Sequence, residues 1–288
     1  MGRRLPFLAN DSGILYFMLT QVDSATTREF LRRLCSAFAA PGNTVVPAGS
    51  ISRNNINERE EQMSPAKSIA FAHGIWADGS SFAKLMPPLR ADGYEVIASQ
   101  HALDDFQADV DCCIRTFGQV PSPIILVGHS YGGAVITAAG NDDRVAGLVY
   151  INALGPDETE TLQGQQDKFP KTDVFKSIKV EEGRVWMLPE GIEYFAADLT
   201  EEEKQVVYAT ASPPAATLFD AKIPKPAWRD KPCWNIVGTD DKAVHPDLER
   251  AAAERMNGKV TEVASSHVPM LSHPDVVLDV IREAASSV

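Results

Sequence analysis

The 288-residue sequence has only four cysteines, and their spacing fits neither a metal site nor a disulfide framework. Cys112 and Cys113 are neighbours in a helical pattern, so their side chains diverge and a bridge between them would be strained. We expect the cysteines to be small buried apolar side chains, and we expect no metal ion. This usage favours a reducing, cytoplasmic compartment, although the sequence leaves an exported form open.

Positive charge and long apolar runs are also scarce. Lys and Arg total 27 against 39 Asp and Glu, which gives a formal net charge of −12. An acidic surface repels phosphate backbones and anionic lipid, so nucleic acid and membrane surfaces are not expected as partners. No stretch approaches the ~18 to 20 apolar residues that span a bilayer. These absences leave small molecules, and a second copy of the chain in a homodimer, as partners.

Residues 1–65 differ in character from the rest of the chain. The apolar run at residues 13–20 follows two arginines, as in a signal peptide, but Asn10 and Asp11 interrupt it and no cleavage site of small residues follows. Residues 51–66 are polar and resemble a linker. We therefore expect residues 1–65 to be a peripheral, poorly ordered extension of a domain that begins near residue 66.

From residue 68 onward, short apolar runs alternate with helical patterns. Strands are expected at 68–72, 94–98, 124–127, 145–151, 233–237 and 259–263. Helices are expected at about 81–91, 103–117, 131–140, 246–257 and 274–286. Several strands are continuously apolar, which indicates a mostly parallel, doubly wound sheet with both faces covered. Residues 66–154 and 225–288 thus form the core of an α/β fold.

Residues 155–224 interrupt this alternation. They are polar, contain prolines and favour helix, as in the segment at 198–208. An insertion of this length is too long for a connecting loop in a compact domain. We expect a helical cap that lies over the strand ends.

The expected nucleophile is Ser130, in the pattern Gly128-x-Ser130-x-Gly132. An apolar strand precedes the pattern and a helix of small residues follows it. A serine at such a strand-to-helix turn is held above the sheet with its hydroxyl exposed, and the glycines let the backbones pass closely. This context favours catalysis over a chance match in a glycine-rich turn.

A serine hydroxyl needs a neighbouring base that is oriented by an acid. His267 follows the last strand and precedes the last helix, where the chain order Ser, acid, His requires the base. His273 is better explained as a helix-entry residue. The strand at 233–237 runs into Asp240 and Asp241, and the residues alone leave both open as the acid.

A tetrahedral intermediate also needs two backbone donors. The first expected donor is the N–H of Tyr131, the residue after the nucleophile. The second is the N–H of Ile75, because Gly74 lets the loop after the first strand approach closely. His73 in the same loop is expected to be structural.

Several segments resemble a bacterial branch of the α/β-hydrolase superfamily that is related to plant methylesterases and hydroxynitrile lyases. These segments are 73–82 (HGIWADGSSF), 126–137 (LVGHSYGGAVIT), 149–157 (VYINALGPD), 234–241 (WNIVGTDD) and 265–274 (SSHVPMLSHP). The resemblance covers residues 66–288. It implies ester hydrolysis without a cofactor, and it assigns the acid to Asp241, five residues before Pro246.

The leading hypothesis is an esterase for small to medium hydrophobic esters that works through an acyl-Ser130 intermediate. A hydroxynitrile lyase and a non-catalytic small-molecule receptor are the alternatives. The related plant lyases depend on a lysine near the histidine, and no lysine stands near His267. Trp76 and Tyr131 are expected to bind substrate. Further candidates for the pocket wall are Phe169, Phe175, Trp186, Met187, Leu188, Tyr194 and Phe195.

Overall fold

The computed structural model describes residues 68–288, and the prediction for residues 1–65 lies outside them. A six-stranded sheet with the order β2-β1-β3-β4-β7-β8 forms the centre of this part, and all its neighbouring strands are parallel. The strands are β1 (Ser68–Ala72), β2 (Glu95–Ala98), β3 (Ile124–His129), β4 (Val145–Ile151), β7 (Cys233–Gly238) and β8 (Lys259–Val263).

The burial of each strand follows its place in the sheet. Strands β1, β3 and β7 are buried along their whole length, and β4 is buried at all but one residue. The edge strands β2 and β8 are partly exposed. Continuously apolar segments are thus central because helices cover them on both faces, as the sequence predicted.

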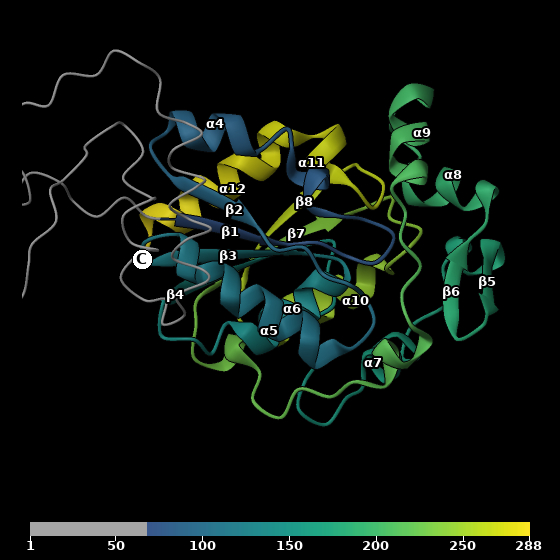
Figure 1. Ribbon diagram of the computed structural model, residues 1–288, viewed down its shortest axis with the longest axis horizontal. Helices are drawn as coiled ribbons and strands as arrows, with labels where there is room; N and C mark the ends of the chain where they lie inside the picture. Colours follow the sequence, from purple (N-terminus) through teal and green to yellow (C-terminus); the bar gives the residue numbers. More distant parts are fainter. Residues whose placement is uncertain (1–67) are drawn as a thin grey trace, which may run out of the picture. The chain divides into compact units, whose positions relative to one another are not determined.

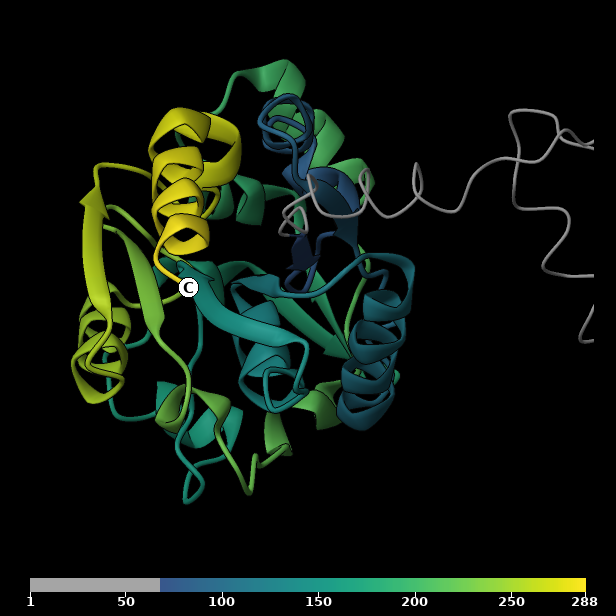
Figure 2. The same ribbon diagram turned by 90° about the vertical axis from the view of Figure 1, so that its left-hand side faces the viewer.

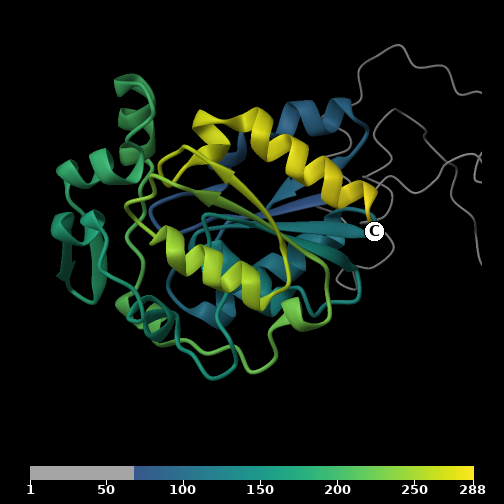
Figure 3. The same ribbon diagram turned by 180° about the vertical axis from the view of Figure 1, so that it is seen from behind.

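Helices cover both faces of the sheet (Figure 1). Helices α4, α11 and α12 lie on one face and α5, α6 and α10 on the other, and Figures 2 and 3 show the same two layers from the end and from behind. In the described residues, no helix combines the length and the apolar character needed to cross a membrane. The helices are α4 (Met86–Ala91), α5 (Phe106–Thr116), α6 (Tyr131–Ala139), α10 (Pro246–Arg255), α11 (Pro269–Ser272) and α12 (Pro274–Ser286).

The segment between β4 and β7 contains more than the predicted helices. It holds α7 (Leu162–Gln166), α8 (Ile192–Phe195), α9 (Glu201–Ala209) and an antiparallel hairpin of β5 (Ile178–Glu181) and β6 (Arg184–Met187). Glu182 and Gly183 both have positive φ angles, of 50° and 74°. Two such residues in a row form the tight turn that suits a hairpin. This hairpin was not predicted from the sequence, although alternating β-branched residues flank the turn.

The described residues contain every strand of the sheet, and β1 begins at Ser68. We therefore expect a chain that starts at Met63 to fold with the same unfolding cooperativity and the same ester turnover as the full chain. Thermal unfolding and an esterase assay on both chains would test this. An insoluble or inactive shorter chain would show that the fold needs residues 1–62.

Candidate active site

Ser130 stands at a strained turn between β3 and α6. Its backbone has φ 56° and ψ −123°, a region that non-glycine residues rarely occupy. Gly132 lets α6 pass very close to β1 at this turn, because a Cβ atom on Gly132 would lie 2.1 Å from the carbonyl oxygen of Ala72. The strain is localised at the predicted nucleophile, as expected for a turn that presents a reactive hydroxyl.

The loop after β1 lies directly against Ser130. A Cβ atom on Gly74 would lie 2.7 Å from the Ser130 Cβ and 3.2 Å from its Oγ, so only glycine fits there. Within the described residues, the backbone amides of Ile75 and Tyr131 donate to no protein acceptor. Both residues line the same cavity as Ser130. The geometry therefore leaves two N–H groups available to an oxyanion beside the serine.

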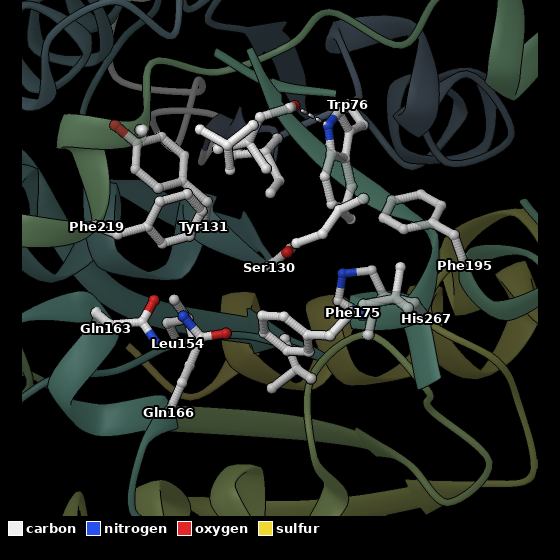
Figure 4. Close-up of a pocket in the computed structure, with 18 of the residues that line it drawn as sticks. Trp76, Ser130, Tyr131, Leu154, Gln163, Gln166, Phe175, Phe195, Phe219 and His267 are labelled. Carbon is white, nitrogen blue, oxygen red and sulfur yellow. Dashed lines mark hydrogen bonds between the residues drawn. The ribbon is translucent and has the colours of Figure 1, made fainter. Parts of the chain in front are cut away.

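His267 and Asp241 form a buried pair next to Ser130. The Nδ1 of His267 lies 2.6 Å from the Oδ2 of Asp241, and both side chains are almost inaccessible to solvent. Figure 4 shows the other side of the His267 ring facing the Ser130 hydroxyl. Because Nδ1 is hydrogen-bonded to the carboxylate, Nε2 is the nitrogen available to the serine.

The Asp241 carboxylate accepts hydrogen bonds on both oxygens. Its Oδ1 accepts from the backbone amides of Ala243 (2.7 Å) and Val244 (3.1 Å), and its Oδ2 accepts from Asn152 Nδ2 (2.9 Å) as well as from His267. Burial by itself would raise the pKa of Asp241, but the charge of His267 and these hydrogen bonds lower it below its ordinary value. The carboxylate is therefore ionised and held in one orientation.

The neighbouring Asp240 has a different environment. Its side chain is exposed at the surface, whereas Asp241 is buried. Of the two aspartates that the residues alone left open, the structure brings Asp241 to the histidine.

Asn152, which the sequence analysis did not single out, joins two parts of the site. It follows β4, with φ 44°, and its Nδ2 also donates to the Ser266 carbonyl at 3.2 Å. One side chain thus fixes both the Asp241 carboxylate and the backbone next to His267. Asparagine at the carboxyl end of a central strand was the available sequence signal, but its partners lie 89 and 114 residues away.

Two further side chains hold the loop that carries His267. The buried His129 donates from Nε2 to the His267 carbonyl at 2.8 Å, and burial lowers the pKa of His129 to about 3, so this ring is neutral. From the inserted segment, Asp198 accepts from the Ser266 amide at 3.1 Å and from the Ser266 hydroxyl. The position of the histidine therefore depends on both the core and the insertion.

The side chains of three other histidines, His73, His101 and His273, have hydrogen-bond partners other than Ser130 and His267. His73 donates from Nδ1 to the Gly74 carbonyl at 2.9 Å and accepts at Nε2 from the His101 amide, also at 2.9 Å. Burial lowers the pKa of His73. His273 contacts the Ser272 hydroxyl and is not among the residues that line the cavity. These bonds fit structural roles.

A cavity of about 260 Å³ opens onto Ser130 (Figure 4). Trp76 and Tyr131 line it as predicted, and both rings are held from behind. The Trp76 indole donates to the Val185 carbonyl of β6 at 2.8 Å, and the Tyr131 hydroxyl donates to the buried carboxylate of Asp109 at 2.8 Å. The rings therefore present fixed apolar faces to a ligand.

The inserted segment supplies much of the cavity wall, but only some of the predicted residues. Phe175 and Phe195 line the cavity, whereas Trp186 is 45% exposed on the outer side of the hairpin. Phe195 also packs edge-on against the His267 ring, with the ring centroids 4.9 Å apart. The other lining residues were not predicted from the sequence: Leu154, Gln163, Gln166, Val174, Ile178, Val180, Val185, Ala216, Phe219, Asp220, Ala243 and Val244.

Glu249, in the first turn of α10, is buried beside Asp241. Burial and then the charge of Asp241 raise the pKa of Glu249 well above its ordinary value of 4.5. The folded state thus holds this proton more tightly than the unfolded chain does. As pH rises above 4.5, Glu249 ionises in the unfolded chain but stays protonated in the folded state. Ionisation lowers the free energy of the unfolded chain, so the free energy of unfolding decreases.

Glu249→Gln should therefore stabilise the protein at high pH relative to low pH, because glutamine cannot ionise. The melting temperature of the variant minus that of the native chain should therefore increase between pH 4 and pH 8, because only the native chain loses stability over this range. Glu254→Gln, at an exposed position on the same helix, is the control and should show no such growth. An equal difference at both pH values for Glu249→Gln would contradict this assignment.

Comparisons with known proteins identify the family to which the chain belongs. Residues 69–280 match the sequence model of the alpha/beta hydrolase family. The chain is 26% identical over 196 residues to alpha/beta hydrolase nvfD of Aspergillus novofumigatus (strain IBT 16806), which covers 60% of this chain and 74% of that protein. It is 32% identical over 112 residues to the carbendazim hydrolyzing esterase of Nocardioides sp. (strain SG-4G), which covers 33% of this chain and 45% of that protein.

Among solved structures, the fold is similar to that of a pyrethroid hydrolase from Sphingobium faniae JZ-2. The TM-score is 0.64 at 22% identity, and the match covers 77% of this chain and 97% of the other. At this identity the likeness concerns the fold alone. The fold class predicted from the sequence is confirmed.

Proposed function

Since this chain belongs to the alpha/beta hydrolase family, we propose that it hydrolyses carboxylic esters through an acyl intermediate on Ser130. One observation carries the proposal: the buried His267–Asp241 pair, joined at 2.6 Å, faces a strained serine inside an apolar cavity. Each element of this arrangement serves acyl transfer, and no other grouping of nucleophile and base lines the cavity in the described residues.

The proposed reaction begins with attack of the Ser130 hydroxyl on the ester carbonyl while His267 Nε2 takes its proton. Asp241 holds the ring and stabilises the imidazolium that forms. The negative oxygen of the tetrahedral intermediate accepts hydrogen bonds from the amides of Ile75 and Tyr131. His267 then returns the proton to the leaving alcohol. A water molecule, activated by the same nitrogen, releases the acid from the acyl-enzyme.

The cavity supports a substrate of small to medium size with hydrophobic acyl and alcohol parts. Its volume is about 260 Å³, and most of its wall is aliphatic or aromatic. The relative from Nocardioides is named an esterase. This name supports ester hydrolysis as the reaction class.

A panel of esters, lactones and cyanohydrins assayed side by side tests this proposal. We expect turnover of short to medium esters, such as p-nitrophenyl butyrate, and no release of aldehyde from cyanohydrins. No lysine is among the residues that line the described cavity, whereas the plant lyases that the sequence resembles depend on one. Aldehyde release without ester hydrolysis would instead make the protein a lyase, and inactivity throughout would favour a receptor.

A further inference from the structure

The amide of Ile75 belongs to a peptide group whose carbonyl is held by a side chain. This trans peptide group joins Gly74 to Ile75, and its Gly74 carbonyl accepts a hydrogen bond from His73 Nδ1 at 2.9 Å. The carbonyl and the N–H of a trans peptide group point in opposite directions. The His73 ring and any acceptor of the Ile75 N–H therefore lie on opposite sides of this group. Ile75 lines the cavity at Ser130, whereas His73 does not.

The next amide along the loop is not available to a substrate. The N–H of Trp76 donates to the Ser212 carbonyl at 3.3 Å, and Figure 4 shows the Trp76 ring next to Ser130. The N–H of Ile75, by contrast, has no acceptor among the described residues. The orientation of the peptide group between Gly74 and Ile75 thus decides whether the loop presents a donor to an oxyanion.

His73 presents a donor to the Gly74 carbonyl in one fixed tautomer. Its Nε2 accepts from the backbone N–H of His101 at 2.9 Å, and a backbone N–H is always a donor. The proton of the neutral ring is therefore on Nδ1, which faces the Gly74 carbonyl. Burial lowers the pKa of His73 and keeps the ring neutral. The His101 ring packs against it with the ring centroids 4.5 Å apart, so the donor is also fixed in orientation.

His73 is the only group in the described residues that donates to the Gly74 carbonyl. Glycine is required at this position, because a Cβ atom would lie 2.7 Å from the Ser130 Cβ. Glycine also restricts its backbone angles less than any other residue, so sterics hold the plane of the following peptide group weakly. The bond from His73 supplies the orientation that the glycine backbone does not.

We propose that His73 is a positioning residue for the oxyanion: its bond to the Gly74 carbonyl holds the Ile75 N–H toward the negative oxygen of the tetrahedral intermediate. This role rests on the proposed function, and His73 performs it without touching the substrate. The bond also strengthens the donor, because hydrogen bonds at the two ends of one peptide group polarise each other. The benefit is greatest once negative charge has developed on the substrate oxygen, so it falls on the transition state.

Asparagine and leucine at position 73 separate this bond from the rest of the side chain. The Nδ2 of asparagine takes the place of the histidine Nδ1 and donates to the Gly74 carbonyl, whereas a leucine methyl group in the same place does not. Both substitutions remove the acceptor of the His101 amide, so that cost is common to both.

His73→Asn should keep kcat/KM for p-nitrophenyl butyrate within a few-fold of the native value. His73→Leu should lower it by about tenfold or more, which is less than the loss of about a hundredfold or more that follows removal of a whole oxyanion donor. The matched control is the same pair of substitutions at His273, whose Nδ1 contacts the Ser272 hydroxyl at 2.9 Å outside the cavity. The asparagine and leucine variants at His273 should not differ.

A trifluoromethyl ketone separates this role from a general loss of structure. The Ser130 oxygen adds to the ketone carbon, the carbonyl electron pair moves to the ketone oxygen, and the serine proton passes to His267. The bound hemiketal thus carries the negative oxygen of the intermediate. In His73→Leu, the inhibition constant of the ketone should rise by the factor by which kcat/KM falls. The affinity for the corresponding carbinol, which forms no such oxygen, should stay nearly unchanged.

A proton NMR measurement on the native chain tests the bond without a substitution at His73, and it decides if His73→Leu does not fold. Formation of the hemiketal should move the His73 Nδ1 proton downfield, because this bond strengthens when the Ile75 N–H binds the negative oxygen. The shift should be absent in Ser130→Ala, which cannot form the hemiketal.

Three results would overturn this assignment: equal ketone affinity in His73→Asn and His73→Leu, a His73 Nδ1 proton that the ketone does not move, or a native chain that does not add the ketone. Failure of the proposed function alone gives a different result, namely no ester turnover by a native chain that still adds the ketone. The ketone measurements decide the role of His73 in that case, so the two failures are distinguishable.

Discussion

Ser130→Ala should lower kcat/KM for p-nitrophenyl butyrate by more than about a thousandfold, because losing the nucleophile of a serine triad normally costs at least this much. The loss should appear in turnover and not in folding, since alanine keeps the backbone of the turn and removes one buried oxygen. Unfolding temperature and circular dichroism would establish that the variant folds.

Ser68→Ala is the matched control for this prediction. Ser68 is also buried, but it lies at the amino end of β1, where its hydroxyl donates to the Pro121 carbonyl at 2.6 Å. This substitution removes a hydrogen bond from the opposite end of the sheet, so it should leave kcat/KM nearly unchanged. Residual activity of Ser130→Ala above about one-thousandth would contradict an acyl-serine mechanism.

Asp241→Asn should lower turnover by about three to four orders of magnitude. An amide at this position turns an N–H toward His267 Nδ1, which favours the tautomer that carries its proton on Nε2. The nitrogen that faces Ser130 can then no longer accept the serine proton. In the native chain the Nδ2 of Asn152 donates to the Asp241 carboxylate at 2.9 Å. In the variant the NH2 group of the new amide faces this donor, and the hydrogen bond is lost.

Asp240→Asn is the control for the acid, because the two aspartates are adjacent in one loop and only Asp241 contacts the histidine. Its turnover should stay within a few-fold of the native value. Steady-state kinetics on both variants would decide between them. The reverse ranking would transfer the role to Asp240 and contradict the proposed arrangement.

Much of the fold was predictable because its signals are local. Each of the six predicted strands is present. The four central strands, β1, β3, β4 and β7, are the buried ones, because helices cover both faces of the sheet. The turn at Ser130 was predictable from its neighbouring glycines, which the close passage of β1 and α6 requires. The sequence signals for these features lie within a few positions of one another, even where the contacts that they permit join distant segments.

The parts of the site that were missed depend on contacts between distant segments. Asn152 meets Asp241 across 89 residues, and nothing near Asn152 in the sequence indicates that partner. The cavity wall was only partly predictable for a similar reason. In β6, successive side chains alternate between faces, so Val185 lines the cavity while Trp186 points outward. The wall could be identified only after the hairpin was known.

The most direct test of the central claim is covalent labelling of the native chain with a fluorophosphonate, followed by intact-mass measurement and peptide mapping. We expect one adduct per chain, located on the peptide that contains Ser130, with loss of esterase activity in proportion to labelling. The adduct should be absent in Ser130→Ala and form far more slowly in His267→Ala. Ester hydrolysis that persists in a fully labelled chain, or an adduct on another residue that accounts for the lost activity, would contradict the assignment of Ser130 as the nucleophile.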